Sequence, residues 1–188
     1  DLCALESSKL LALRPKLQMI FQDPYASLNP RMTGYETLAE PLLYHRLATK
    51  QTVGKQVQQL MDDVGLDRSS ALKYPHEFSG GQRQRIAIGR AIATQPEFIV
   101  ADEPVSALDV TIQAQILELI LSLVEQRNLT MLFISHDLSV VRSICDRVAV
   151  MQQGKLVELG ETEKLWAKPD MPYTQELLQA IPSATPKS

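Results

Sequence analysis

The sequence predicts an α/β fold with a parallel sheet, because short apolar runs alternate with helical patterns along the chain. The runs cover residues 17–21, 98–101 and 131–135. Continuous apolar runs of this length, separated by helices, are typical of parallel strands that are buried on both faces. In such sheets ligands bind just beyond the carboxyl ends of the strands, so we expect a functional site at that edge.

Polar residues follow each of these runs. Gln22 follows the first, Asp102 and Glu103 the second, and His136 the third. An amide, two carboxylates and an imidazole at one edge suit a magnesium-bound polyphosphate and an attacking water. Pro104 predicts an extended backbone at Glu103, which would point the two carboxylates apart so that one holds Mg²⁺ and the other polarises water. Taken singly, each residue also fits an ordinary strand end.

The other elements follow from turn and helix signals. Residues 23–30 are rich in turn formers, residues 33–66 have helical patterns with one helix before His45 and another ending near Gly65, and residues 74–77 read as a loop. Further along we expect helices over 80–93, 109–127 and 138–144, a hairpin of strands 147–151 and 155–159, and helices over 162–167 and 173–180.

Bulk composition limits the function classes. The 188 residues suit one medium domain with a subdomain, and the net charge of -3 argues against nucleic acid as the main partner. Cys3 and Cys145 lack the spacing of metal ligands, which favours two reduced thiols. No apolar run approaches the roughly 20 residues that span a bilayer, so we expect any membrane association to come through a partner.

A glycine pair opens one of the predicted helices, in the segment Ser79-Gly80-Gly81-Gln82. Ser followed three residues later by Gln is a capping box, which explains the ends of the segment. Two glycines in the first turn make sense if backbone N–H groups lie against a phosphate with no Cβ between them. Both interpretations stay open on the residues alone. Asp109 is a favourable N-cap for the next helix.

In this order and spacing, the motifs resemble the nucleotide-binding subunit of an ABC transporter over nearly the whole chain. The resemblance implies a P-loop NTPase fold, RecA-like and ABC-type, with an inserted helical subdomain. It implies that Gln22 is the Q-loop glutamine, which contacts the nucleotide and the metal, and that Ser79, Gly80, Gly81 and Gln82 form the nucleotide-contacting signature motif. Asp102 would be the magnesium ligand at the end of the Walker B strand, Glu103 the catalytic carboxylate and His136 the catalytic switch histidine. Ser106 to Asp109 would form the D-loop, in which Asp109 would contact the nucleotide. The cofactors implied are ATP and Mg²⁺.

Longer segments around these motifs resemble one branch of that family, the bacterial oligopeptide, dipeptide and glutathione importers. The matching segments are residues 21–30, residues 74–79, and a tail with Met171-Pro172-Tyr173-Thr174, Leu177-Leu178 and Ile181-Pro182. The branch implies an ATPase subunit that powers peptide import from the cytoplasmic face of a bacterial inner membrane. Its partners would be a second ATPase subunit, identical or not, permease subunits and, indirectly, an extracytoplasmic binding protein, with no nucleic acid. Peptide, glutathione and nickel remain open as substrates, and no iron–sulfur cluster is expected.

One family motif is absent: no Gly-rich loop ending in Lys-Ser/Thr occurs between Asp1 and Ser188. We expect the protein to continue before Asp1; the alternative is a degenerate cassette that lacks this motif. We divide the chain into a partial core (1–32), a helical subdomain (33–94), a second core segment (95–160) and a tail (161–188). Loss of the P-loop strand should strip a neighbour from the Asp102 strand, so that residues 1–188 alone neither bind ATP nor fold cooperatively.

Two other functions compete with transport. A soluble ABC ATPase acting on DNA would carry a long coiled coil before the signature, whereas about 57 residues separate Gln22 from Ser79; ribosome-acting relatives usually carry two cassettes. A non-catalytic cassette that lends only its signature motif to an active partner is the second competitor. For an importer, we expect the helical insertion and residues 23–30, with Tyr25 and Leu28, to contact the permease.

Overall fold

The computed structural model describes residues 2–180, and the contacts within it divide the chain into two units, Asp1–Ile134 and Ser135–Ser188. Each unit is described by itself. The sequence places boundaries elsewhere, after residues 32, 94 and 160, and that four-part division stays a prediction. The Ile181-Pro182 match of the tail lies outside the described residues.

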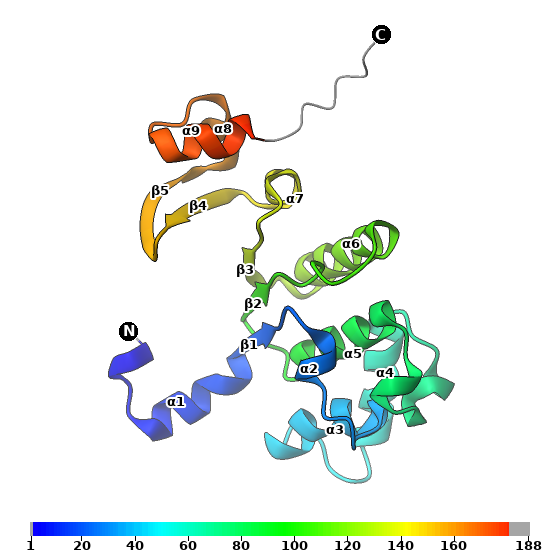
Figure 1. Ribbon diagram of the computed structural model, residues 1–188. Coiled ribbons are helices and arrows are strands. Elements are labelled where there is room, and N and C mark those ends of the chain that lie inside the picture. The colour runs from blue at the N-terminus through cyan, green and yellow to red at the C-terminus, as the bar shows by residue number, and fades with distance from the viewer. Residues whose placement is uncertain (1, 181–188) are drawn as a thin grey trace. The chain divides into compact units, whose positions relative to one another are not determined.

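A parallel sheet forms the centre of the first unit (Figure 1). Its strands in spatial order are β1 (Leu17–Ile20), β2 (Phe98–Asp102) and β3 (Thr130–Ile134). The register pairs Ile20 with Ala101 on one side of β2, and Asp102 with Ile134 on the other. The predicted parallel sheet is confirmed. The expectation that the Asp102 strand lacks a neighbour is wrong, because β2 is the central strand and is paired along both edges.

The sheet is less buried than the apolar runs suggest. In β2, the fully buried Ile99 and Ala101 alternate with half-buried residues, and Leu132 of β3 is 48 % exposed. The strands are therefore buried on one face, where the helices pack, and not on both faces. Continuous apolar runs alone do not distinguish these two cases.

Helices fill the sequence between the strands of this unit. The elements before β1 are η1 (Leu2–Ala4), α1 (Ser7–Leu13) and η2 (Arg14–Lys16). Those between β1 and β2 are α2 (Pro24–Ser27), α3 (Gly34–Tyr44), α4 (Val53–Asp63), η3 (Arg68–Leu72), η4 (Pro75–Glu77) and α5 (Gly80–Ile92). Helix α6 (Val110–Arg127) connects β2 to β3. The sequence predicts α3, α4, α5 and α6 within a few residues. It gives no sign of α1, because that helix has no side-chain cap and buries no residue.

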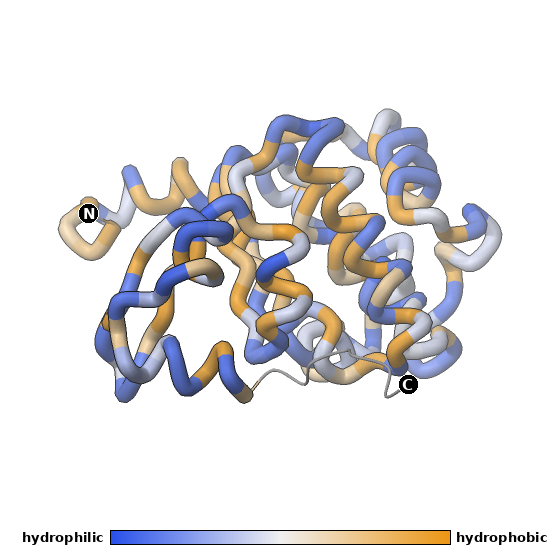
Figure 2. Tube along the Cα trace, turned by 90° about the horizontal axis from the view of Figure 1, so that it is seen from above, coloured by the Kyte–Doolittle hydropathy of each residue, from blue (hydrophilic) through white to orange (hydrophobic). Residues whose placement is uncertain are grey.

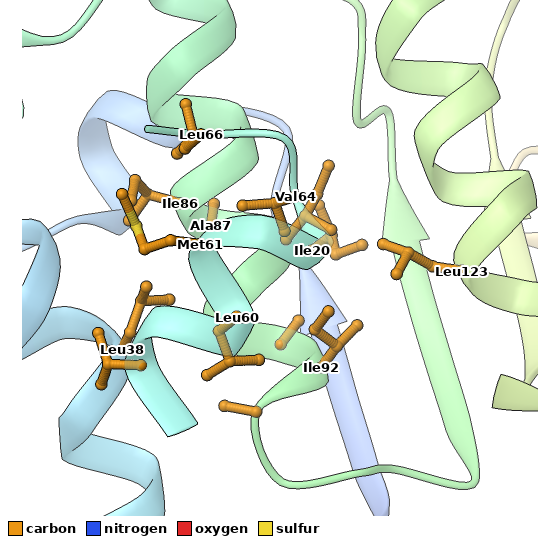
Figure 3. Packing of buried hydrophobic residues seen from close by; sticks show 14 of the residues in the cluster. Ile20, Leu38, Leu60, Met61, Val64, Leu66, Ile86, Ala87, Ile92 and Leu123 are labelled. Atoms are coloured by element: carbon orange, nitrogen blue, oxygen red, sulfur yellow. The ribbon is translucent and has the colours of Figure 1, made fainter. Parts of the chain in front are cut away.

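The core of the first unit gathers around α5 (Figure 3). Ile86 and Ile92 of α5 are each 1 % exposed, and with Leu38 of α3 and Met61 of α4 they belong to one buried cluster that also includes Ile20 of β1. Burying a side chain of this size contributes about 1.5–3 kcal/mol. Figure 2 shows the same pattern in sequence, with hydrophobic residues recurring between hydrophilic ones along the helices. Residues along the length of α5 belong to this cluster, so α5 is the central helix of the core.

Residues 135–180, the described part of the second unit, form a hairpin and three helices. These elements are α7 (Leu138–Ile144), β4 (Arg147–Gln152), β5 (Lys155–Glu161), α8 (Thr162–Ala167) and α9 (Pro172–Gln179). β4 and β5 are antiparallel, with an irregularity between Val150 and Met151. Gln153 and Gly154 both have positive φ, 50° and 76°, as a two-residue hairpin loop requires. The sequence predicts all five elements. None of the helices within residues 2–180 is long and apolar enough to cross a membrane.

Candidate functional site

The ends of β1 and β2 bring Gln22 to Glu103. Because the two strands are parallel and Ile20 is paired with Ala101, the residues that follow them leave the sheet at the same edge. There Nε2 of Gln22 donates a hydrogen bond to Oε2 of Glu103 over 2.9 Å. The structure thus confirms that two of the predicted site residues, 81 positions apart, meet at the carboxyl edge of the sheet.

The backbone of Glu103 is not extended. Its φ is +43°, in the left-handed region, where a non-glycine residue costs about 1–2 kcal/mol. Three hydrogen bonds hold it there: its N–H donates to the carbonyl of Ile134 (2.9 Å), and its own carbonyl accepts from the N–H (3.2 Å) and the hydroxyl (3.1 Å) of Ser106. The prediction drawn from Pro104 is wrong, because the long-range bond to Ile134 and the turn closed by Ser106 override the preference that Pro104 imposes. A strained residue fixed from several sides is typical of functional sites.

Asp102 is the last residue of β2, as the sequence predicts, and directly precedes Glu103. Its side chain is half-buried. Carboxylate and amide oxygens are the ligand types that Mg²⁺ takes, and Mg²⁺ is usually bound by one or two carboxylates together with substrate phosphates and water. The described residues hold no group of three or more His, Cys, Asp or Glu side chains that could chelate a metal unaided. Asp102 and the side-chain oxygen of Gln22 supply ligands of these types at the carboxyl ends of adjacent strands, and their role as metal ligands stays a prediction.

The helix start at Ser79 is a complete capping box. The Ser79 hydroxyl accepts from the N–H of Gln82 (3.3 Å), and the Gln82 side chain accepts from the N–H of Ser79 (3.0 Å). This confirms the structural interpretation of both side chains. The capping box uses the N–H group of Gln82, and the N–H groups of the two glycines lie at the start of the helix next to the exposed Ser79. A helix start of this kind favours the binding of an anion.

Both glycines of this turn have close neighbours. A Cβ built on Gly81 would lie 2.7 Å from Cγ2 of Ile112, and one on Gly80 would lie 3.4 Å from Cδ2 of Leu108. Gly81 is therefore required by the packing of α5 against α6, whether or not a phosphate binds. The sequence motif alone does not show this neighbour, because Ile112 lies 31 positions further along.

Asp109 is the N-cap of α6, as the sequence predicts, and its side chain accepts from the N–H of Ile112 (3.0 Å). Since Leu108 and Ile112 are the neighbours of Gly80 and Gly81, the Asp109 turn lies against the start of α5. Two of the predicted motifs are thus in contact, the signature segment and the segment from Ser106 to Asp109.

His136 belongs to the second unit, two residues after the end of β3, and is exposed. Glu103 lies in the first unit, and each unit is described by itself. The catalytic role of His136 therefore stays a prediction.

Several residues that support the site are not evident from sequence motifs. Ser106 binds the Glu103 carbonyl, and Arg83 and Arg90 of α5 contact the segment that follows Gln22. Gln84 is fully buried, and among the described residues neither side-chain atom of its amide has a hydrogen-bond partner. The sequence gives these arginines no distinct signal, because the same helix also carries Gln82 and Gln84.

Comparison with known proteins places these features in a family. The family model described as ABC transporter matches residues 4–106. The chain is 57% identical over 179 residues, 95% of its length, to the oligopeptide transport ATP-binding protein OppF of Bacillus subtilis (strain 168), and spans 59% of that protein. It is 50% identical over 97% of its length to the glutathione import ATP-binding protein GsiA of Pectobacterium atrosepticum, of which it spans 29%.

A solved structure shares the fold. The ATP-binding cassette MJ0796, solved as a dimer in a post-hydrolysis state with ADP and Pi, is 28% identical, with a TM-score of 0.73 over 85% of this chain and 68% of that one. The match thus extends from the sequence motifs to the arrangement of the strands and helices. The chain belongs to the ABC transporter family.

Proposed function

We propose that this chain is part of a subunit that binds and hydrolyses ATP to drive an ABC importer of peptides. The observation that carries the proposal is the contact between Gln22 and Glu103 at the carboxyl edge of the sheet, next to Asp102. The high identity to an oligopeptide transport ATP-binding protein supports it. The chain spans about 59% of that relative, so the activity proposed is that of the full-length protein.

Glu103 is the group that would activate water. Phosphoryl transfer to water depends mainly on positioning and on charge stabilisation. The Glu103 carboxylate orients the water and accepts its proton, while the amide of Gln22 fixes the carboxylate by the 2.9 Å hydrogen bond. Asp102 and Gln22 would hold Mg²⁺, which neutralises charge on the phosphates when bound. His136 would contact the γ-phosphate.

The helix start at Ser79 would serve the nucleotide of a second cassette. Ser79 is exposed, and the N–H groups of Gly80 and Gly81 begin a helix of 13 residues. The free N–H groups and the dipole of a helix start favour a phosphate, so this one would contact the nucleotide bound by an opposing subunit. Two cassettes would then close head to tail around two nucleotides. The dimeric state of the MJ0796 cassette supports the formation of a dimer.

The partners proposed are a second ATPase subunit, permease subunits and, indirectly, an extracytoplasmic binding protein, with the chain at the cytoplasmic face of the membrane. Identities of 50–57% to import ATP-binding proteins favour this function over a soluble ATPase acting on DNA or ribosomes. Glutathione is the second candidate substrate, because GsiA is a glutathione import protein.

Reconstitution tests the proposal. The full-length protein is placed in liposomes with its permease subunits and binding protein, and uptake of a labelled tripeptide is compared with uptake of labelled glutathione. We expect ATP-dependent uptake of the tripeptide. Uptake of glutathione without uptake of the tripeptide would show that the substrate is glutathione and not a peptide. ATP hydrolysis without uptake of either compound would overturn the proposal.

A further inference from the structure

Two arginines of α5 hold the segment that follows Gln22. Nη1 of Arg90 donates to the backbone carbonyl of Ser27, the last residue of α2, over 2.6 Å. The guanidinium carbon of Arg83 lies 5.5 Å from the centre of the Tyr25 ring, within the range of a cation–π contact. Arg83 and Arg90 are seven residues, about two turns, apart and so lie on one face of the helix. α2 is therefore attached to α5 at two points.

The attached segment is itself rigid. The Asp23 carboxylate accepts hydrogen bonds from the N–H groups of Tyr25 (2.8 Å) and Ala26 (3.2 Å), which closes the turn directly after Gln22. Leu28, at its other end, is 3 % exposed and belongs to the core cluster. The Asp23 bonds and the buried Leu28 therefore hold residues 23–28 in one conformation against the core that surrounds α5.

Arg90 is well placed to carry this connection. It is half-buried, and burial lowers its pKa while the charge of Glu40 opposes that effect. A guanidinium that donates to a carbonyl in a partly desolvated site makes a stronger bond than a neutral donor does. The bond joins residues 63 positions apart, so it links two segments that the local chain does not hold together.

We propose that Arg90 is a positioning residue that fixes the segment after Gln22 to α5, so that a displacement of Gln22 is transmitted to Ser79. The eleven helical residues from Gly80, next to Ser79, to Arg90 span about 16 Å and act as a stiff connection. The inference rests on the proposed function, in which Gln22 contacts one nucleotide and Ser79 contacts the nucleotide of the opposing cassette. Through Arg90, nucleotide bound at Gln22 would thereby set the position of the surface that closes on the partner.

Arg85 provides a matched control. It lies on the same helix, is half-buried like Arg90, and its Nη1 donates to a backbone carbonyl, that of Val64, over 2.7 Å. Val64 is the C-cap of α4, within the helical insertion, so this bond does not reach the segment after Gln22. Arg85→Met removes the same kind of bond as Arg90→Met and leaves the proposed connection intact.

The experiment measures nucleotide binding and dimerisation separately. Full-length protein carrying Glu103→Gln, to prevent turnover, is titrated with ATP and Mg²⁺; dimer formation is followed by analytical ultracentrifugation and binding by the fluorescence of trinitrophenyl-ATP. We expect Arg90→Met to bind the analogue as the parent does but to need about tenfold more ATP for half-maximal dimerisation, a usual size for coupling between sites. Arg85→Met should match the parent in both, and Arg90→Lys, which keeps one donor, should lie between.

Equal effects of Arg90→Met and Arg85→Met on dimerisation would overturn the inference, as would an unchanged Arg90→Met. If Arg90→Met does not fold, Arg90→Lys is compared with Arg85→Lys by the same criterion. Failure of the parent protein to bind ATP or to dimerise would instead overturn the proposed function.

Discussion

The side-chain amide of Gln22 donates to the carboxylate of Glu103 over 2.9 Å, and this bond joins the ends of two adjacent parallel strands. Glu103 is held at the same time through its backbone, by Ile134 and Ser106, at a φ of +43°. A carboxylate positioned from both its backbone and its side chain is pre-organised for a single task. The Gln22 side chain is thus a means of tuning the Glu103 carboxylate.

The Gln22 contact predicts a loss of turnover. Gln22→Met removes the donor to Oε2 of Glu103, and Gln22→Glu in addition places a second negative charge beside that carboxylate. Because the proposed base loses its orienting bond in both variants and meets a like charge in the second, kcat of the full-length protein should fall in both and further in Gln22→Glu. Steady-state ATPase assays measure the effect. A Gln22→Glu protein with the kcat of the parent would refute this coupling.

The glycine pair predicts a difference in stability. Gly81→Ala places a methyl group 2.7 Å from Ile112, and overpacking of this kind destabilises by about 1–3 kcal/mol, partly offset by the better helix propensity of alanine. Gly80→Ala meets Leu108 at ordinary contact distance and should be tolerated. Urea unfolding of the full-length protein measures both. A Gly81→Ala protein as stable as Gly80→Ala would mean that packing does not require this glycine.

The sequence predicts Tyr25 and Leu28 together as a permease contact, but the structure separates them. Tyr25 is 62 % exposed, whereas Leu28 is 3 % exposed and lies in the core, so its assignment to a docking surface is wrong. Leu28→Ala should lower the free energy of unfolding by about 2–5 kcal/mol. Tyr25→Ala removes the exposed cation–π contact with Arg83 and should lower it by only about 0.5–1 kcal/mol, but should reduce peptide uptake relative to ATP hydrolysis. Normal uptake by a stable Tyr25→Ala protein would remove Tyr25 from the docking surface.

Two substitutions of Asp109 distinguish its role as the N-cap of α6 from a role in nucleotide binding. Asp109→Ala removes the bond to the N–H of Ile112 and should destabilise the protein by about 0.5–2 kcal/mol, whereas Asp109→Asn keeps an acceptor and should be nearly as stable as the parent. Thermal unfolding distinguishes the two. If both variants are stable yet lose ATPase activity, Asp109 acts on the nucleotide and its role as a cap is minor.

Local signals predict the elements that define this site, and tertiary contacts explain what they miss. The caps at Ser79 and Asp109 mark the starts of α5 and α6, and the apolar runs mark the three strands. The left-handed backbone of Glu103 depends on Ile134 and Ser106, so the preference imposed by Pro104 does not predict it.

The contacts of the signature helix are equally non-local. Gly81 is required by Ile112, and Arg90 binds Ser27, which lies 63 positions away. Both relationships exist only once the helices have packed. The motif therefore indicates where the helix begins, but not which residues require its glycine or anchor its far end.

Turnover of the Glu103→Gln variant tests the central claim most directly. If Glu103 is the general base, ATP hydrolysis by the full-length protein should fall about 10²–10⁴-fold, while ATP still drives dimerisation. Hydrolysis at a near-normal rate in this variant would show that the carboxylate beside Gln22 does not activate the attacking water.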